Sequence, residues 1–600
     1  MTINYKAPLR DMEFVYYELF NGEELTKLPG YEEAEPETVK AILQEAAKMA
    51  ENVLLPLNQS GDEEGCRFES GNVTAPKGFK EAYDIFTEGG WHGLSTDPEF
   101  NGMGLPHSLS IVLGEMMTTT NHSFSMYTSL TYAAGKAIQA CGTQAQKETY
   151  LTKFVEGDWS GTMCLTEAQC GTDLGLITTK AEPKLDVCED AFTINGSKIF
   201  ISAGDHDLTD NIVHLVLVRL PDAPKGVKGI SLFLVPKFIV NDDGSLGERN
   251  TVSCGSIEHK MGIKGSATSV MNFDDARGFL VGEQNKGLNY MFTMMNYERL
   301  GMGIQGIGAT EVSYQQAAAY AHDRLQGRSA TGVKLSDKAA DPLIVHADVR
   351  RMLLTMRSLN EAGRCFSTYV AKQLDLVKYS NNVEIKTKAE HLVALLTPVA
   401  KAFLTDMSYE NCGLGQMVFG GHGYVREWGQ EQLVRDVRIA QIYEGTNGIQ
   451  SLDLLGRKVV ATKGQLFNEY EKEIKQFINE HSANHELSIF IKPLQAALEK
   501  LTQLTETLLT HSKEDKNAVG ASATDYLAVF GYVSYTYMWA MMVEKSLAKT
   551  EQDDFYQAKL YVGQFFIQKI LPKMDCHIQA IQSGSEPIMA MPADLFGYKE

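Results

Sequence analysis

A glutamate with apolar neighbours is the clearest candidate for chemistry in this chain. Glu444 lies in residues 442–446, IYEGT, directly after Ile442 and Tyr443. Apolar and aromatic neighbours desolvate a carboxylate and raise its pKa toward neutrality, which a general base for proton abstraction requires. Gly445 leaves room beside the backbone for a substrate. The segment therefore predicts a base at Glu444 with Tyr443 and Gly445 beside the substrate; the alternative is a surface glutamate in a turn.

A glycine-rich segment suggests another kind of chemistry, the binding of a dinucleotide. Residues 301–306, GMGIQG, match the GxGxxG pattern, and Asp323 follows near the position of a ribose-binding carboxylate. That pattern needs a strand before the glycines, whereas residues 294–300, MMNYERL, contain no β-branched residue. We therefore predict close packing of two helices at these glycines and no dinucleotide fold.

The cysteines and histidines do not support a metal site. The nine cysteines are scattered without a CxxC pair, and no cluster of cysteines and histidines has zinc-ligand spacing. Because residues 1–14 also lack the apolar run of a secretory signal, we expect reduced thiols in a cytoplasmic protein. The histidines that invite a metal or acid–base role are predicted to be structural: His206, His259 and His422.

The charge balance limits the possible partners. The chain has 55 Lys and Arg against 76 Asp and Glu, a formal net charge of −21, and residues 466–600 contain 12 basic and 18 acidic residues. Such a surface repels DNA and anionic lipid, so an anionic ligand can bind only at local donors. No nucleic-acid partner is expected.

Three segments carry a resemblance to a known family. They are residues 164–173, CLTEAQCGTD; residues 260–268, KMGIKGSAT, with FDD at 273–275; and residues 441–448, QIYEGTNG. In this order and spacing the chain resembles the acyl-CoA dehydrogenase family over residues 40 to 460. Residues 5–14 and the extension after Lys463 are similar to a bacterial subgroup. That subgroup includes 3-methylmercaptopropionyl-CoA dehydrogenases and long-chain fatty acyl-CoA dehydrogenases.

The resemblance implies a reaction, a cofactor and partners. The implied reaction is the FAD-dependent removal of hydrogens from Cα and Cβ of an acyl-CoA thioester to give a trans-2-enoyl-CoA. Either a fatty acyl-CoA or 3-methylthiopropanoyl-CoA would be the substrate, with electrons passed to an electron-transfer flavoprotein by a homodimer. Three alternatives stay open: an acyl-CoA oxidase, a flavin-containing relative that binds DNA, and an acyl-CoA binder without activity.

The resemblance also names a base and a rival. Glu444 matches the family's glutamate, and a backbone N–H of its segment is expected to donate to the thioester carbonyl oxygen. Glu298, in residues 296–299 (NYER), stands where some branches of the family carry the base, with Arg299 as a substrate contact. The alternative for Glu298 is an ion pair on a helix surface.

The implied contacts with the flavin ring lie in the middle of the chain. Thr166 is similar to the residue that hydrogen-bonds the ring, and Gly171 and Thr172 would offer N–H groups to phosphate or CoA. Their alternative is an ordinary loop. Phe200 would cover one flavin face and Ser202 would donate to N5; alternatively, Phe200 is a core residue of a β-domain.

The implied contacts with the rest of the cofactor lie further along. Arg324 is similar to an arginine that reaches the flavin pyrophosphate of a neighbouring subunit, and Arg328 could share that role. The chain departs from the family pattern there by one missing residue. Thr446 and Asn447 are expected near the AMP part, with helix capping as the alternative.

The paired glycines Gly420 and Gly421 also match a cofactor contact of the family. Relatives usually place a glutamine three residues before the first glycine. Met417 holds that position here, and Gln416 lies one step away, which is about 100° around a helix.

Helices and a small sheet must position these residues. Apolar residues at helical spacing predict helices up to about residue 160 and again from Leu288, with stripes at 467–478 and 494–508 in the last part. Between them, residues 213–218 and 230–235 read as strands. Asn195-Gly196 predicts a two-residue hairpin between residues 192–194 and 198–201.

The predicted fold is mainly α with an inserted β-domain, as in acyl-CoA dehydrogenases, and the middle domain is expected to be barrel-like. The predicted domains are an N-terminal extension (1–35), a helical N-terminal domain (36–160), a β-domain (161–282), a helical bundle domain (283–464) and an additional C-terminal helical domain (465–600).

One uncharged stretch, residues 526–543, is long enough to raise the question of a membrane. Its tyrosines, glycine and hydroxyl residues favour a buried helix of a bundle. Peripheral contact with a membrane surface is the alternative.

Overall fold

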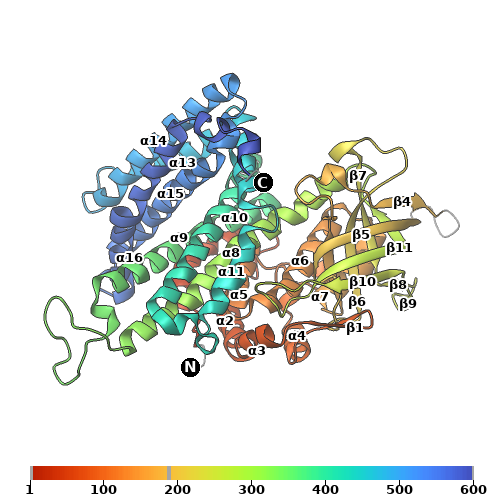
Figure 1. The fold of residues 1–600 in the computed structure, drawn as a ribbon, viewed down its shortest axis with the longest axis horizontal. Coiled ribbons are helices and arrows are strands. Elements are labelled where there is room, and N and C mark those ends of the chain that lie inside the picture. The colour runs from red at the N-terminus through yellow and green to blue at the C-terminus, as the bar shows by residue number, and fades with distance from the viewer. Residues whose placement is uncertain (1–3, 185–190, 598–600) are drawn as a thin grey trace. The chain divides into compact units, whose positions relative to one another are not determined.

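A computed structural model of the chain describes residues 4–184 and 191–597 (Figure 1). Cys188, expected to be a reduced thiol, lies outside these residues. The chain forms two compact units, one from residues 41–301 and one from residues 1–40 together with 302–600. The predicted class is confirmed, because long helices dominate and a sheet lies in the middle of the chain.

Helices come first in the unit of residues 41–301. Two of them begin at side-chain caps, since Asn121 accepts from Phe124 N at 3.0 Å and Thr143 forms a capping box with Gln146. The helices are α2 (Pro36–Met49), α3 (Pro56–Glu64), α4 (Phe79–Glu88), α5 (His107–Thr120), α6 (His122–Cys141) and α7 (Gln144–Val155), with a small hairpin of β1 (Arg67–Glu69) and β2 (Asn72–Thr74).

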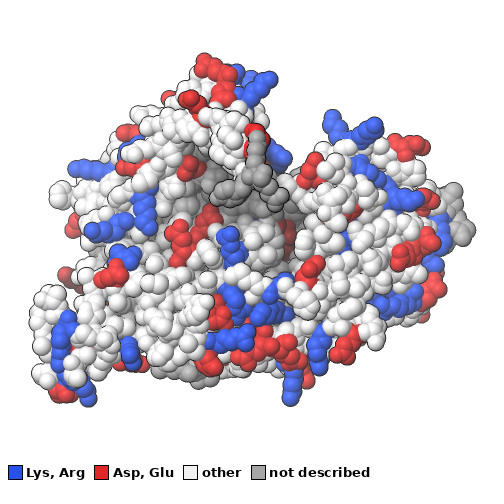
Figure 2. Space-filling model, viewed as in Figure 1, with Lys and Arg blue, Asp and Glu red and all other residues white. Residues whose placement is uncertain are grey.

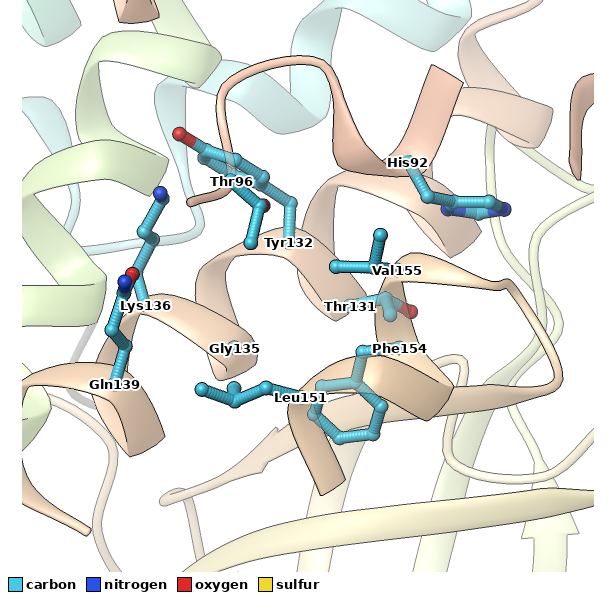
Figure 3. A pocket seen from close by; sticks show the side chains of 10 residues that line it. All are labelled: His92, Thr96, Thr131, Tyr132, Gly135, Lys136, Gln139, Leu151, Phe154 and Val155. Atoms are coloured by element: carbon cyan, nitrogen blue, oxygen red, sulfur yellow. The ribbon is translucent and has the colours of Figure 1, made fainter. Parts of the chain in front are cut away.

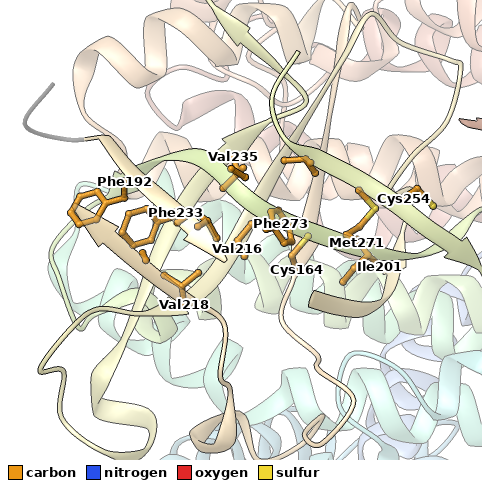
Figure 4. Packing of buried hydrophobic residues seen from close by; sticks show 14 of the residues in the cluster. Cys164, Phe192, Ile201, Val216, Val218, Phe233, Val235, Cys254, Met271 and Phe273 are labelled. Carbon is orange, nitrogen blue, oxygen red and sulfur yellow. The ribbon is translucent and has the colours of Figure 1, made fainter. Parts of the chain in front are cut away.

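A seven-stranded sheet follows and curves toward a barrel. Its strand order is β10-β11-β5-β4-β6-β3, and β7 pairs with both β11 and β6, which closes part of the sheet on itself. The sheet encloses the apolar cluster of Figure 4, which includes Phe192, Phe233 and Phe273. The strands are β3 (Trp159–Cys164), β4 (Lys180–Pro183), β5 (Ala191–Ser202), β6 (Asn211–Arg219), β7 (Ile230–Pro236), β10 (Val252–Ile257) and β11 (Thr268–Val281), beside a separate pair, β8 (Phe238–Val240) and β9 (Leu246–Arg249).

The hairpin predicted at Asn195-Gly196 is wrong. Both residues lie inside the long strand β5, where Asn195 pairs with Lys180 of β4 and Gly196 pairs with Phe273 of β11. Pairing on both sides outweighs the local turn preference. Gly196 is needed for a different reason, because a Cβ there would lie 2.5 Å from Thr179 Oγ1.

The glycines of the GxGxxG segment lie inside helix α8, as predicted. A Cβ on Gly303 would lie 2.5 Å from Ala400 O, and one on Gly306 would lie 2.6 Å from Ser408 Oγ. These two glycines therefore let α8 approach α10 closely. The helices of this part are α8 (Gly287–Asp323), α9 (Ala347–Tyr379), α10 (Val383–Phe419), α11 (Gln430–Arg438) and α12 (Asn447–Leu452).

The last helices bury the predicted stripes. The leucines of residues 494–508 are buried on α14, and Phe467, Tyr470, Ile474 and Ile478 are buried on α13. Residues 526–543 lie in the largely buried helix α15, and none of the helices in the described part of the chain has the length and apolar character to cross a bilayer. The elements are α13 (Gln465–His481), α14 (Ser488–Glu514), α15 (Ala518–Leu547), α16 (Asp554–Phe565), α17 (Met574–Gln582), α18 (Glu586–Met589) and, at the start of the chain, α1 (Leu9–Glu13).

Candidate active site

Glu444 occupies the apex of a sharp turn between α11 and α12. Its φ is +54°, in the left-handed region, and Gly445 follows with φ +83°. A glutamate in this region carries backbone strain on the order of 1–3 kcal/mol, which persists only where the surroundings impose it. The side chain is partly exposed. The turn therefore presents one carboxylate in an enforced conformation.

Hydrogen bonds hold this turn from several directions. Gln450 Nε2, from α12, donates to the carbonyl oxygen of Glu444 at 3.1 Å. The hydroxyl of Tyr443 donates to Oε1 of Gln305, a buried residue of α8. Its hydroxyl thus anchors Tyr443, the residue that directly precedes Glu444 in the chain.

Thr446 and Asn447 are engaged with the protein itself. Thr446 is the N-cap of α12 and accepts from Ile449 N at 3.4 Å, so the helix-capping alternative describes its side chain. Asn447 Nδ2 donates to Asp406 Oδ1 at 2.6 Å, and its Oδ1 accepts from Lys401 Nζ at 2.8 Å. The cofactor contacts of both residues remain predictions.

The predicted ring contacts cluster on a loop of the sheet unit. This loop surrounds Glu167, whose buried carboxylate accepts from Lys198 Nζ at 2.8 Å. Burial opposes ionisation, but the Lys198 charge holds the pKa of Glu167 well below its ordinary value. The anchored loop displays Thr166, half-buried, and the exposed Gly171 and Thr172. The sequence shows Glu167 beside Thr166 but has no local signal for its partner 31 residues away.

Phe200 and Ser202 lie at the end of β5. Phe200 is 60% exposed and has a φ of +60°, so the alternative that it belongs to the β-domain core is wrong. An exposed aromatic ring in an enforced conformation is suited to a flat ligand. Ser202 is half-buried and pairs with Thr268 of β11.

Glu298 and Arg299 are buried in α8, with 3% and 7% of their surfaces exposed. The placement of Glu298 on a helix surface, which its alternative assumed, is therefore wrong. The Arg299 guanidinium lies over the ring of Phe292 at 5.9 Å. Burial alone does not separate a catalytic from a structural role for Glu298.

The two candidate arginines differ in their surroundings. Arg324 is exposed just after the end of α8. Arg328 is committed to its own loop, because it donates to Leu335 O at 2.9 Å and to the buried Asp341 carboxylate at 3.2 Å. Backbone donors lower the pKa of Asp341 to about 2, so it remains an anion that organises the loop. These contacts favour Arg324 over Arg328 as the arginine available to a ligand.

The paired glycines end α10. Gly420 has a φ of +59°, and a Cβ on Gly420 or Gly421 would meet no atom within 4 Å. Met417 is 68% exposed on the last turn, whereas Gln416 donates to Gly423 O at 3.1 Å. Gln416 therefore supports the turn that follows the helix.

Two of the three histidines with possible roles have structural partners. His206 lies 3.0 Å from Ser160 Oγ, and burial lowers its pKa to about 3, so the ring is neutral at physiological pH. His422 lies 3.0 Å from the hydroxyl of Tyr320 and stacks on Trp428. Among residues 4–184 and 191–597 no group of three or more candidate ligands could hold a metal ion.

A small cavity lies between α6 and α7 (Figure 3). Its volume is about 20 Å³, room for one water molecule. Thr131, Lys136 and Gln139 line it together with Leu151 and Phe154. An acyl chain needs a much larger pocket, so this cavity is too small to hold the substrate.

The comparison with protein families covers nearly the whole chain. The N-terminal, middle and C-terminal domains of acyl-CoA dehydrogenases match residues 36–158, 162–276 and 285–459, and an acetyl-CoA dehydrogenase C-terminal-like domain matches residues 470–592.

Relatives and solved structures agree with this result. A 3-methylmercaptopropionyl-CoA dehydrogenase of Ruegeria pomeroyi is 40% identical over 98% of this chain and 99% of its own length. FadE5 of Mycobacterium tuberculosis, a broad-specificity linear acyl-CoA dehydrogenase, is 30% identical over 99% of this chain and 100% of its own. Caenorhabditis elegans ACDH-11 in complex with C11-CoA shares the fold, with a TM-score of 0.78, 17% identity, and 98% and 96% of the two chains covered. The chain therefore belongs to the acyl-CoA dehydrogenase family, whose members are flavoprotein oxidoreductases that act on acyl-CoA.

Proposed function

We propose that this protein oxidises an acyl-CoA thioester at Cα and Cβ to the trans-2-enoyl-CoA, with Glu444 as the base and FAD as the cofactor. The observation that carries the proposal is the enforced left-handed conformation of Glu444 in a turn held by Gln450 and Tyr443. A carboxylate on a strained, well-anchored backbone, in a segment that matches a motif of the family, is typical of a catalytic group.

The chain's own groups would carry out the proton chemistry. A thioester Cα–H is a very weak acid, so its removal needs a positioned base and a donor for the developing enolate oxygen. Glu444 would accept the Cα proton on its carboxylate. A backbone N–H of the turn would donate to the thioester oxygen, and Gly445 leaves room for that approach because it has no side chain.

The residues around Phe200 fit a flavin. The exposed Phe200 ring offers an aromatic face, and Thr166 and Ser202 offer hydroxyl donors from the neighbouring loop and strand. Gly171 and Thr172 are exposed and could donate to phosphate. When bound, FAD supplies the acceptor for the β-hydride, which no side chain can provide. A solved acyl-CoA dehydrogenase from Bacillus anthracis with FAD shares the fold, with a TM-score of 0.75 and 19% identity.

For the substrate we propose 3-methylthiopropanoyl-CoA as the first candidate and straight-chain acyl-CoA as the second. The Ruegeria relative named for the thioether substrate is 40% identical, against 30% for the broad-specificity relative. Reduction of the flavin by a panel of acyl-CoAs from C4 to C18 plus the thioether would rank them. A preference for long chains over the thioether would reject the first candidate.

An electron-transfer flavoprotein is the proposed acceptor, and the proposed assembly is a homodimer. Light scattering in solution tests the dimer. Turnover with ferrocenium under anaerobic conditions, compared with peroxide formation in air, separates a dehydrogenase from an oxidase. Rapid peroxide formation without an added acceptor would favour the oxidase.

Two variants test the base. Glu444→Gln is expected to lower kcat by about 10²- to 10⁴-fold, the usual contribution of a general base, at unchanged flavin content. Glu298→Gln is the matched control, because it removes the charge of the rival carboxylate. Loss of turnover in Glu298→Gln with activity retained in Glu444→Gln would reverse the assignment.

The DNA-binding alternative has little support from the surface. Figure 2 shows acidic and basic side chains interspersed over the face in view, and residues 466–600 are acidic overall. A salt-dependent mobility shift of duplex DNA by the pure protein would revive that alternative.

A further inference from the structure

A polar cluster on α10 lies under the turn that carries Glu444. Asp406 accepts from Gln441 Nε2 at 2.6 Å and from Asn447 Nδ2 at 2.6 Å, with both bonds to the same oxygen, Oδ1. Gln441 lies three residues before Glu444 and Asn447 three residues after it. One carboxylate oxygen thus binds both ends of the turn.

Two neighbours on the same helix complete the cluster. Lys401 is fully buried, and its Nζ donates to Asn447 Oδ1 at 2.8 Å. Thr405 Oγ1 accepts from Asn447 Nδ2 at 3.0 Å. Both the amide oxygen and the amide nitrogen of Asn447 are therefore used by α10, which orients the residue firmly.

These hydrogen bonds matter because the backbone of Glu444 is strained. A left-handed glutamate relaxes to an ordinary conformation unless its flanks are fixed. A displacement of about 1 Å in a catalytic group can lower a rate on the order of 100-fold. The bonds from Gln441 and Asn447 fix the flanks, while Gln450 fixes only the carbonyl groups at the apex.

We propose that Asp406, acting through Gln441 and Asn447, is a positioning residue that keeps the Glu444 turn in its reactive conformation. This inference rests on the proposed role of Glu444 as the base. Asp406 itself is not expected to touch the thioester. Burial raises the pKa of the Asp406 carboxyl group, whereas the two amide donors and the charges of Lys401 and Arg438 lower it. The amide donors therefore favour the ionised carboxylate, whose oxygen accepts both hydrogen bonds.

Kinetics of Asp406 variants test the proposal in the full-length, flavin-loaded protein. Asp406→Leu removes the shared acceptor and is expected to lower kcat about 10- to 100-fold with KM changed less than about threefold. Asp406→Asn retains one acceptor oxygen and is expected to restore most of the rate. Gln441→Leu removes one bond and gives a smaller loss, which keeps the test available if Asp406→Leu does not fold.

Two further readouts distinguish positioning from general support of the fold. The apparent pKa of the base in the kcat–pH profile should move in Asp406→Leu, because the carboxylate of Glu444 changes its surroundings. Thr397→Val on the same helix is the matched control: Thr397 is buried, its hydroxyl donates to Val393 O of its own helix, and neither kcat nor the profile should change.

Each outcome decides between the possibilities. Wild-type kcat in folded Asp406→Leu, or a lower kcat with a pH profile that does not move, would overturn the positioning role. Flavin loss from Asp406→Leu at an unchanged rate per bound flavin would assign the cluster to cofactor binding and also overturn it. Failure of the proposed function is a separate result, since Glu444→Gln would then remain active whatever Asp406 variants do.

Discussion

The buried ion pair of Glu167 and Lys198 determines the shape of the loop that displays Thr166. The two charged groups are 3% and 0% exposed. The Glu167 carboxylate also accepts from the backbone N–H groups of Thr178 and Thr179, at 2.7 and 3.0 Å. A buried pair of this kind adds little net stability over apolar residues, but removing one partner leaves a charge without compensation.

Lys198→Met is therefore expected to be severe. The free energy of unfolding should fall by on the order of 3 kcal/mol, and flavin content should fall with it because the Thr166 loop loses its anchor. Chemical denaturation and flavin absorbance measure the two effects. Lys180→Met, which breaks an exposed pair with Glu182, is the control and should change stability by less than about 1 kcal/mol. Equal effects of the two variants would contradict the role of burial.

The same pair predicts a pH dependence. Lys198 holds the pKa of Glu167 below its ordinary value. A depressed carboxyl pKa contributes stability that is fully present above the ordinary pKa of about 4.3 and is lost as the pH falls below it. The stability difference between wild type and Glu167→Gln should accordingly shrink in acid. A difference that grows as the pH falls would contradict the sign.

At the scale of elements, the close contact of α8 with α10 depends on glycines, which have no side chain. Gly303 faces the backbone oxygen of Ala400, which cannot move aside as a side chain can. The pattern that suggested a dinucleotide site is thus a helix-packing surface.

Gly303→Ala should lower the free energy of unfolding. The clash with Ala400 O outweighs the gain in helix propensity, for a net loss of about 1–2 kcal/mol. Gly413→Ala on α10 is the matched control: a Cβ there meets no atom within 4 Å, so it should stabilise by about 0.5–1 kcal/mol. Denaturant unfolding of both variants measures the two changes. Changes of the same sign in the free energy of unfolding would contradict the prediction.

At the scale of the whole molecule, buried ion pairs join the first residues of the chain to helices α9 and α16. Asp11 of α1 forms buried ion pairs with Arg364 of α9 and Lys559 of α16. Lys559 also pairs with Glu361 at 2.8 Å, and Arg364 with Glu311 at 2.7 Å. The network joins segments from both ends of the sequence to the helical bundle.

Asp11→Ala should loosen this junction. Burial alone would raise the pKa of Asp11, but Lys559 and Arg364 lower it to about 2. Its contribution is therefore complete above the ordinary pKa of about 4 and is lost as the pH falls toward 2. At neutral pH we expect a loss on the order of 3 kcal/mol and faster proteolysis after residue 464.

Glu18→Gln is the control for that experiment. It weakens partly exposed pairs with Arg10 and Lys549, and the expected change is below about 1 kcal/mol. Proteolysis of Asp11→Ala at the wild-type rate would show that the ion pairs of Asp11 do not stabilise this part of the protein.

The amino-acid sequence by itself indicated the family, through the three segments that resemble its motifs. It also determined most helices and strands, because apolar periodicity reports directly which face of a helix or strand is buried. The stripes on α13 and α14 and the strands β6 and β7 were predictable for this reason. The helical glycines of α8 were predictable because no strand-like segment precedes them. Only the tertiary structure placed Asn195-Gly196 inside a strand, exposed Phe200, buried Glu298, and joined Asp11 to Lys559 across 548 residues and Asp406 to Asn447 across 41. Strand pairing and partners of buried charges depend on segments distant in sequence, and no local pattern encodes which of them meet.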